Sequence, residues 1–203
     1  MAEIENFDTA LRQRQRAPSL KRLSQELVLL RSEDPSPFTA PALAYIYPLA
    51  LMRSWTLVTA FHRWMELAGP DGVYVEGVHG NSDKLPRTEP DLFPEHSLMI
   101  EVKPGMPPPT WRFVFIGQGF VESHHKKFHG RTVGSYPSRE VQLVISQNYL
   151  ELIARRQPAV ARIDGPTLRG WNCYDRLWLP ICLPDGSMSR FVTVTEPIVR
   201  LLD

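Results

Sequence analysis

The chain has 203 residues, of which 43% are hydrophobic and 22% charged, and its formal net charge at pH 7 is +1. A typical domain contains about 100–150 residues, so this length fits one domain with an appendage, and the ordinary composition excludes wholesale disorder. Because basic and acidic side chains nearly cancel, we expect no nucleic-acid partner.

The N-terminal residues predict a cytoplasmic helical segment. Acidic side chains precede any apolar run, which fits neither a secretory signal nor an acid-poor transit peptide: Glu3, Glu5 and Asp8. Leucines then recur at helical 3-4-3 spacing: Leu20, Leu23, Leu27 and Leu30. Two heptads are short for a coiled coil and favour a helix docked on its own domain. We nevertheless expect a homodimer through the N-terminal helices as the most economical assembly.

The next segment is uncharged from Pro35 to Met52 and is interrupted by prolines. A membrane-spanning helix needs about 20 predominantly apolar residues, so this segment favours a buried helix or a peripheral membrane contact. We take the buried helix as the expectation, without membrane contact. The sequence therefore predicts one or two aromatic helices over Thr39–Leu67, divided near Pro48.

Residues 69–94 are rich in Gly, Pro, Asn and Asp and predict a connecting loop. The expected division is a helical extension over 1–68, this loop, and a domain over 95–203. Short β-branched or aromatic runs in the last part predict five strands: Ser97–Lys103, Trp111–Gly117, Val160–Ile163, Tyr174–Leu183 and Arg190–Thr195. A helical pattern over Ser138–Arg156 separates the second strand from the third, and Pro184–Gly186 predicts a hairpin turn.

The central strands are apolar on both faces, whereas a sheet open to water on one side would alternate with polar residues. Phe113 and Phe115 alternate with other apolar residues, as do Leu177 and Leu179. Something must therefore cover the second face. We predict that the aromatic helices of residues 39–67, or a partner subunit, supply that cover.

Four sequence blocks resemble a family of single-domain PAS-like proteins of bacteria, common in alphaproteobacteria. Their order and spacing carry the resemblance, which covers about residues 85–197: Leu85–Pro94, Trp111–Gly119, Phe128–Gly134 and Arg176–Gly186. The resemblance implies an α+β, PAS-like fold, with a five-stranded antiparallel sheet, crossover helices and a pocket between them. It implies sensing or protein interaction through an unknown signalling partner rather than catalysis, and it names no cofactor.

Several apolar residues of the strands and the crossover helix could line such a pocket, although an ordinary core is the competing interpretation. The candidates are Arg112, Phe113, Phe115, Tyr149, Ile153, Leu177 and Leu179. Arg112 and also Arg176 interrupt apolar strands. Each could contact a ligand or reach outward to water.

The alternative function is a metal- or small-molecule-binding protein or enzyme that uses the segment His124–His129. If this segment is helical, His125 and His129 lie on one face and could bind a metal, although two histidines are too few alone. Basic residues beside them could bind an anion instead: Lys126, Lys127 and Arg131. A solvated polar turn is the plainer interpretation. No hydrolase, kinase or nucleotide-binding signature occurs, so we expect no enzymatic activity.

Two smaller motifs contain glycine or cysteine residues. Gly117 and Gly119 follow a predicted strand without a following βαβ unit, so we interpret them as positions of unusual backbone angles rather than a dinucleotide fingerprint. Asn172–Cys173 is similar to the motif of light-sensing flavin PAS domains, but in that family the motif lies on a helix between the second and third strands. We therefore predict that Cys173 is a strand residue and that no disulfide links it to Cys182.

Overall fold

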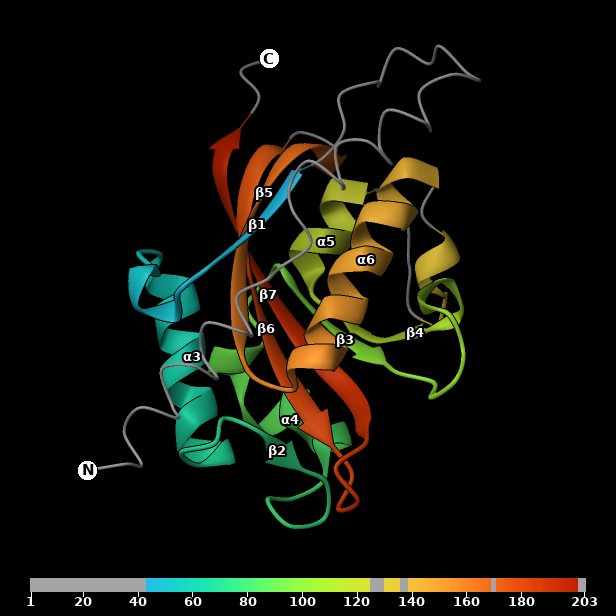
Figure 1. Cartoon of the computed structure of the whole chain (residues 1–203). Coiled ribbons are helices and arrows are strands. Elements are labelled where there is room, and N and C mark those ends of the chain that lie inside the picture. Colours follow the sequence, from blue (N-terminus) through green and yellow to red (C-terminus); the bar gives the residue numbers. More distant parts are fainter. Residues whose placement is uncertain (1–42, 125–129, 136–138, 169–170, 201–203) are drawn as a thin grey trace, which may run out of the picture. The chain divides into compact units, whose positions relative to one another are not determined.

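The computed structural model describes residues 43–124, 130–135, 139–168 and 171–200. Residues 42–203 form one compact unit by their contacts. The predicted leucine stripe between Leu20 and Leu30 lies outside the described residues, and so does most of the predicted extension. Figure 1 shows the described residues of this unit in colour.

A seven-stranded sheet forms the centre of this unit. The order along the sheet is β1-β5-β6-β7-β3-β4, with every neighbouring pair antiparallel, and the short β2 lies parallel to the end of β6. The strands are β1 (Leu43–Tyr47), β2 (Tyr74–Val75), β3 (Ser97–Glu101), β4 (Arg112–Ile116), β5 (Ala159–Leu168), β6 (Trp171–Cys182) and β7 (Met188–Arg200).

Helices lie before the sheet and in the crossover between β4 and β5. The α-helices are α3 (Trp55–Ala68), α4 (Leu85–Thr88), α5 (Gln118–His124) and α6 (Arg139–Arg155). Single 3₁₀ turns are η2 (Leu49–Leu51), η3 (Ser82–Lys84), η4 (Pro90–Leu92), η5 (Pro108–Thr110) and η6 (Val133–Ser135). The antiparallel sheet with a few helices is an α+β architecture, consistent with a PAS-like fold.

The five strands predicted from residue 97 onward are confirmed, as is the helix over Ser138–Arg156, which is α6. The strand count of five is wrong, because β1 and β2 bring it to seven. The helix expected near Tyr45 and Tyr47 is also wrong, since these residues pair with β5 in β1. Tertiary pairing overrides the local helical pattern here.

The segment predicted as a connecting loop, residues 69–94, is more ordered than a loop. It contains β2, α4 and two 3₁₀ turns, and it buries four large side chains of the hydrophobic core: Tyr74, Leu85, Leu92 and Phe93. These residues join the same hydrophobic cluster as α3. The segment therefore contributes to the core, because its apolar residues extend the cover over one face of the sheet.

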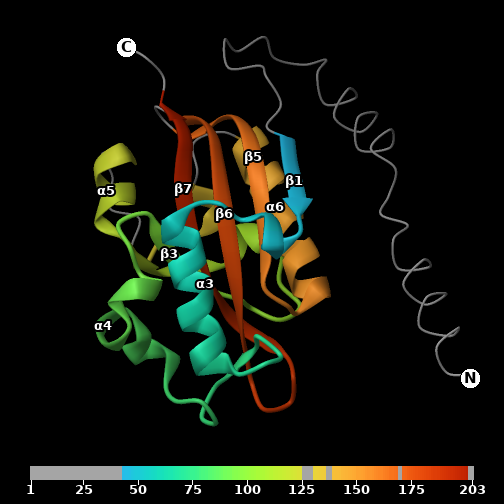
Figure 2. The same ribbon diagram turned by 90° about the vertical axis from the view of Figure 1, so that its left-hand side faces the viewer.

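The unit has three layers, with α3 on one face of the sheet and α5 and α6 on the other (Figures 1 and 2). One hydrophobic cluster joins α3 to the sheet and a second joins α5 and α6 to it. The prediction that a helix from residues 39–67 covers the second face is confirmed for α3. Two apolar faces in the sequence thus correspond to two covered faces in the fold.

α3 is fixed at both ends and along its buried side. The Ser54 hydroxyl accepts a hydrogen bond from the Leu57 amide at 3.3 Å, which caps the first turn. The buried residues follow helical spacing: Leu57, Ala60, Trp64 and Ala68. The indole of Trp64 donates to the Gly72 carbonyl at 2.8 Å. Gly69 ends the helix with φ of 74°, a conformation that favours glycine.

Candidate ligand-binding face

The predicted pocket residues divide between the two faces of the sheet. Three of them belong to the cluster beside α6: Phe113, Tyr149 and Ile153. Three others belong to the cluster beside α3: Phe115, Leu177 and Leu179. Arg112 is exposed on the edge strand β4. Only the first three therefore lie on the side of the crossover helix, and a ligand pocket lined by them stays a prediction.

A β-bulge explains why Phe113 and Phe115 separate. Met99 pairs with Phe115 and Ile100 pairs with Phe113, so Val114 is an extra residue in β4. An extra residue on one strand reverses the alternation of side chains beyond it. Phe113 therefore points towards α6 and Phe115 towards α3, where its ring contacts Phe93 edge to face at a centroid distance of 5.0 Å.

The most unusual residue of the α6 side is a buried arginine. Arg176 lies in β6 between Tyr174 and Trp178, which both face α6, so strand alternation directs it to the same side. Arg176 is only 1% exposed. Nε donates to the Thr195 hydroxyl at 3.0 Å, and the guanidinium carbon lies 5.0 Å from the ring centroid of Tyr174. Burial excludes the outward, solvated arrangement predicted as one of its two roles, and the contact with a ligand stays a prediction.

Further polar groups are buried on this face of the sheet. Thr193 and Thr195 alternate along β7 with valines that face α3, and Thr193 is paired in register with Trp178. From α6, Ser146 is buried one turn before Tyr149. Within the described part of the chain, no hydrogen-bond partner lies near the hydroxyls of Ser146 and Thr193 or the indole nitrogen of Trp178. A buried polar atom without a partner costs about 1–3 kcal/mol, so these groups favour a water or a ligand.

Aromatic side chains pack together on the same face of the sheet. The rings of Trp111 and Tyr149 are stacked at a centroid distance of 6.2 Å, and Tyr149 meets Phe191 at 4.7 Å. Beside Phe191 and Trp178 lies a small cavity of about 10 Å³. This volume holds about one water molecule, and its lining includes neither Arg176 nor the hydroxyls of Ser146 and Thr193.

The α3 side has a polar network of its own, at the end of the sheet next to β1. Arg162 donates from Nε and Nη2 to the two carboxylate oxygens of Asp175, at 3.1 and 3.2 Å. Tyr47 from β1 also forms a hydrogen bond to Asp175. The pKa of Tyr47 is raised above its usual range, mainly by burial of the side chain and secondly by the nearby Asp175 carboxylate. The network connects β1, β5 and β6, which is a structural role.

The histidine segment lies largely outside the described residues, including His125, Lys126, Lys127 and His129. Arg131 is described and exposed, and its carbonyl accepts a hydrogen bond from the Phe113 amide at 2.8 Å. Among the residues that the structure describes, no group of three or more His, Cys, Asp or Glu side chains is placed to bind a metal. The metal and anion sites predicted for this segment stay predictions.

Gly117 and Gly119 are required by close packing and not by backbone angle, which corrects the sequence interpretation. Neither has a positive φ. A Cβ at Gly117 would overlap the main-chain carbonyl of Glu95, and a Cβ at Gly119 would overlap the imidazole ring of His96. The start of α5 thus lies directly against the residues that lead into β3.

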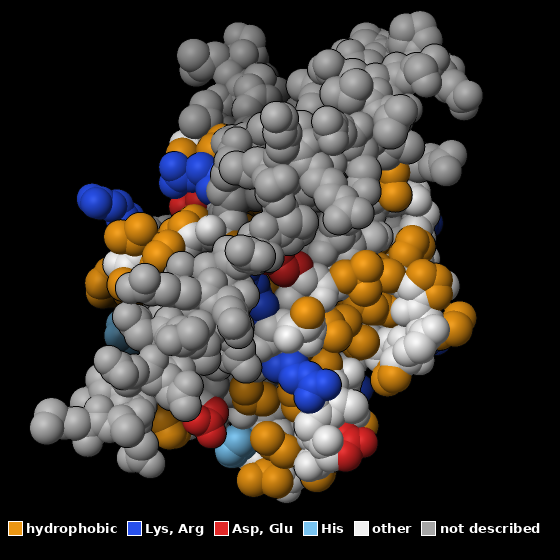
Figure 3. Space-filling view, in the orientation of Figure 1, with side chains coloured by type: hydrophobic (Ala, Val, Ile, Leu, Met, Phe, Trp, Pro, Cys, Tyr) orange, Lys and Arg blue, Asp and Glu red, His pale blue; other side chains and the backbone are white. Residues whose placement is uncertain are grey.

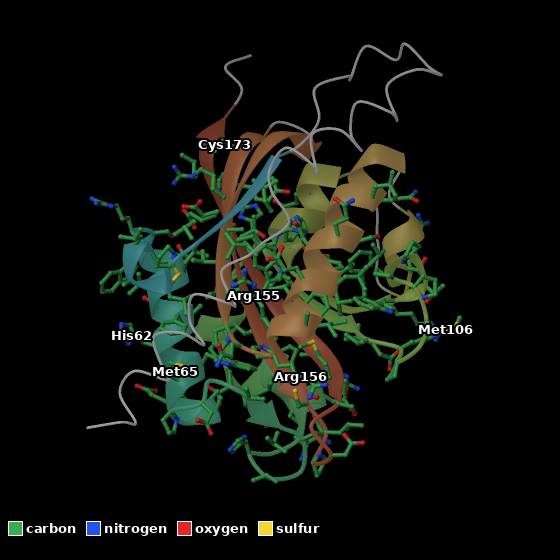
Figure 4. The ribbon with its side chains drawn as sticks, viewed as in Figure 1. His62, Met65, Met106, Arg155, Arg156 and Cys173 are labelled. Carbon is green, nitrogen blue, oxygen red and sulfur yellow. The ribbon has the colours of Figure 1, made fainter. Side chains whose placement is uncertain are left out.

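Cys173 lies in β6, and no disulfide links it to Cys182. Figure 4 shows Cys173 near one end of the sheet, far from Arg156 at the other end. Burial raises the pKa of the Cys182 thiol, so this cysteine is a core residue.

No helix within the described residues is long and apolar enough to cross a membrane. No protein-family model matches the chain, and no curated protein sequence matches it. Several solved structures are similar, among them one described as "Flavin Analogue Sheds Light on Light-Oxygen-Voltage Domain Mechanism". That chain is 12% identical, with 52% of this chain and 78% of the other covered and a TM-score of 0.37. So distant a likeness carries no argument about ligand or activity.

Proposed function

We propose that the chain is a non-catalytic, PAS-like sensory or adaptor module that binds a small acidic ligand between α6 and the sheet. The observation that supports it is the burial of Arg176 on this face, together with hydroxyl and indole groups that can donate hydrogen bonds. Charge-assisted hydrogen bonds from a guanidinium to a carboxylate or phosphate are stronger than bonds between neutral groups, so an acidic ligand suits a face that contains a buried arginine.

Signalling would follow from the close packing of α6 on the face of the sheet where Arg176 is buried. Because a ligand larger than water requires more space, binding would favour conformations in which α6 lies farther from the sheet. A partner protein or a second copy of the chain would detect that shift. We propose a homodimer through the N-terminal helices, and light scattering on the full chain over a range of concentrations tests it. A monomer at every concentration would contradict the dimer.

The ligand proposal is tested with a panel of small dicarboxylates and inorganic phosphate, by thermal unfolding of the full chain. At least one member should raise the melting temperature of the wild type, because a ligand that binds only the folded state stabilises it. Arg176→Met keeps the side-chain volume and removes the charge, so this response should be lost. The matched control is Arg112→Met in the exposed edge strand, which should respond as the wild type does.

Folding of the Arg176→Met variant is checked separately by its circular dichroism and its melting temperature without ligand. Arg176→Met removes the hydrogen bond to the Thr195 hydroxyl, so we expect a lower melting temperature without ligand, and an unchanged circular dichroism spectrum establishes that the variant is folded. The proposal is rejected if no acid of the panel stabilises the wild type, or if the wild type and the Arg176→Met variant respond equally. A response to a metal that depends on His125 and His129 would instead support the alternative function.

A further inference from the structure

Two large hydrophobic side chains are exposed where η2 leads into α3. The exposed fraction is 57% for Leu51 and 82% for Trp55, which is the highest value for a large hydrophobic residue in the described part of the chain. They are four residues apart, so their Cα atoms are separated by at most about 14 Å. Figure 3 shows hydrophobic side chains at the surface in this region of the molecule.

The packing of α3 does not account for Trp55. The side of α3 that faces the sheet is formed by other residues, of which Leu57 and Trp64 are fully buried. Burying a tryptophan removes roughly 150–250 Å² from water, yet here most of that area stays exposed. A tryptophan at the surface beside another apolar residue is typical of a contact surface.

The charges around these two side chains are basic. Arg53 is exposed between them, and it forms no ion pair with the carboxylates of the described residues. The sequence from Leu43 to Met65 contains no Asp or Glu, and the first turn of α3 has no acidic residue. Arg63, farther along α3, is already paired with Glu66 and Glu89 at 2.7 Å each. The surface therefore combines apolar side chains with one unneutralised cation.

The small area of this surface argues for a membrane rather than a protein partner. Leu51 and Trp55 together offer roughly 300 Å², whereas a stable protein interface buries about 800 Å² on each partner. A membrane interface needs less, because tryptophan is favoured at the level of the lipid headgroups and a nearby arginine is attracted by anionic lipids.

We propose that the surface formed by Leu51, Arg53 and Trp55 binds the headgroup region of an anionic lipid membrane, as a peripheral and reversible contact. From the sequence alone, a peripheral membrane contact of the segment that ends at Met52 was the less favoured alternative to a buried helix. The structure places η2 and the exposed start of α3 at this position instead. The proposal is independent of the ligand at Arg176, which faces the other side of the sheet.

Co-sedimentation of the full chain with vesicles tests the proposal, with phosphatidylcholine alone and with added phosphatidylserine. The wild type should bind the phosphatidylserine vesicles, and Trp55→Ser should weaken binding roughly tenfold because the main apolar anchor is lost. Leu51→Ser should act in the same direction. Arg53→Gln should weaken binding to phosphatidylserine vesicles only, and added salt should remove the difference between the variant and the wild type.

Leu150→Ser is the matched control, since Leu150 is 52% exposed on α6, on the other face of the sheet. It should leave vesicle binding unchanged. Unchanged melting temperatures establish that the variants are folded. The proposal is overturned if the wild type stays in the supernatant, or if Leu150→Ser weakens binding as much as Trp55→Ser does. It is also overturned if Trp55→Ser leaves vesicle binding intact and instead dissociates a dimer seen by light scattering, because the occupant would then be a second copy.

Discussion

Two tryptophans of α3 allow one substitution to be compared in opposite surroundings. Trp64 is fully buried against the sheet, whereas Trp55 is 82% exposed. Trp64→Ala removes a core aromatic side chain, which costs about 3–5 kcal/mol, and deprives the Gly72 carbonyl of a hydrogen bond worth about 1 kcal/mol. We expect a loss of about 4–5 kcal/mol for Trp64→Ala. Trp55→Ala should change the free energy of unfolding by less than about 0.5 kcal/mol.

Urea unfolding, monitored by circular dichroism, measures the free energy of unfolding of both variants, and thermal unfolding measures their melting temperatures. For a unit of this length, 1 kcal/mol corresponds to a change of about 2–4 °C in melting temperature, so Trp64→Ala should lower it by roughly 10–15 °C. Because a domain is stable by only about 5–15 kcal/mol, the variant should remain folded but close to its limit. Equal effects of the two substitutions, or a cost below about 1 kcal/mol for Trp64→Ala, would refute the packing of α3 on the sheet.

Two further predictions follow from contacts on either side of the sheet. The raised pKa of Tyr47 means that its folded form keeps its proton when an unfolded tyrosine ionises, so its stabilisation is complete below about pH 10 and is lost as the pH rises further. Tyr47→Phe should reduce this alkaline loss in urea titrations, and an unchanged slope would argue against its hydrogen bond to Asp175. Gly119→Ala should destabilise the protein by about 1–3 kcal/mol, because the new methyl group overlaps the ring of His96. In a double-mutant cycle, His96→Ala should relieve the cost of Gly119→Ala. It should not relieve the cost of Gly117→Ala, because that methyl group would meet a main-chain carbonyl. Equal coupling energies in the two cycles would contradict this geometry.

The sequence was sufficient for the five strands beyond residue 97 and for α6, because their periodicity and turn residues agree with the final pairing. It was not sufficient for β1. Leu43–Tyr47 is a short apolar run next to a helical pattern, and a run of this kind does not distinguish a strand from a helix. Pairing with β5 decides its conformation. β2 has only two residues, too few for any periodic signal.

The site was harder to predict than the fold, for a reason visible at Val114. A strict alternation places Phe113 and Phe115 on one face, but a single bulged residue moves them to opposite faces. No turn residue in β4 indicates the bulge in advance. Arg176 shows the converse problem, since its sequence position fits both a solvated and a buried arginine. Only the packing of α6 over that face of the sheet shows that it is buried.

The two covers of the sheet differ in what their displacement would cost. Moving α3 would expose a largely apolar interface and break both the Trp64 hydrogen bond and the 2.7 Å ion pair between Arg63 and Glu89. Moving α6 would also expose apolar side chains, but it would give water or a ligand access to buried polar groups, among them Ser146 and Trp178, whose pairing recovers part of that free energy. We therefore expect a ligand-driven population shift to concentrate in α6. Hydrogen exchange with and without a stabilising acid should change protection in α6 and leave α3 protected, and a change confined to α3 would reverse this assignment.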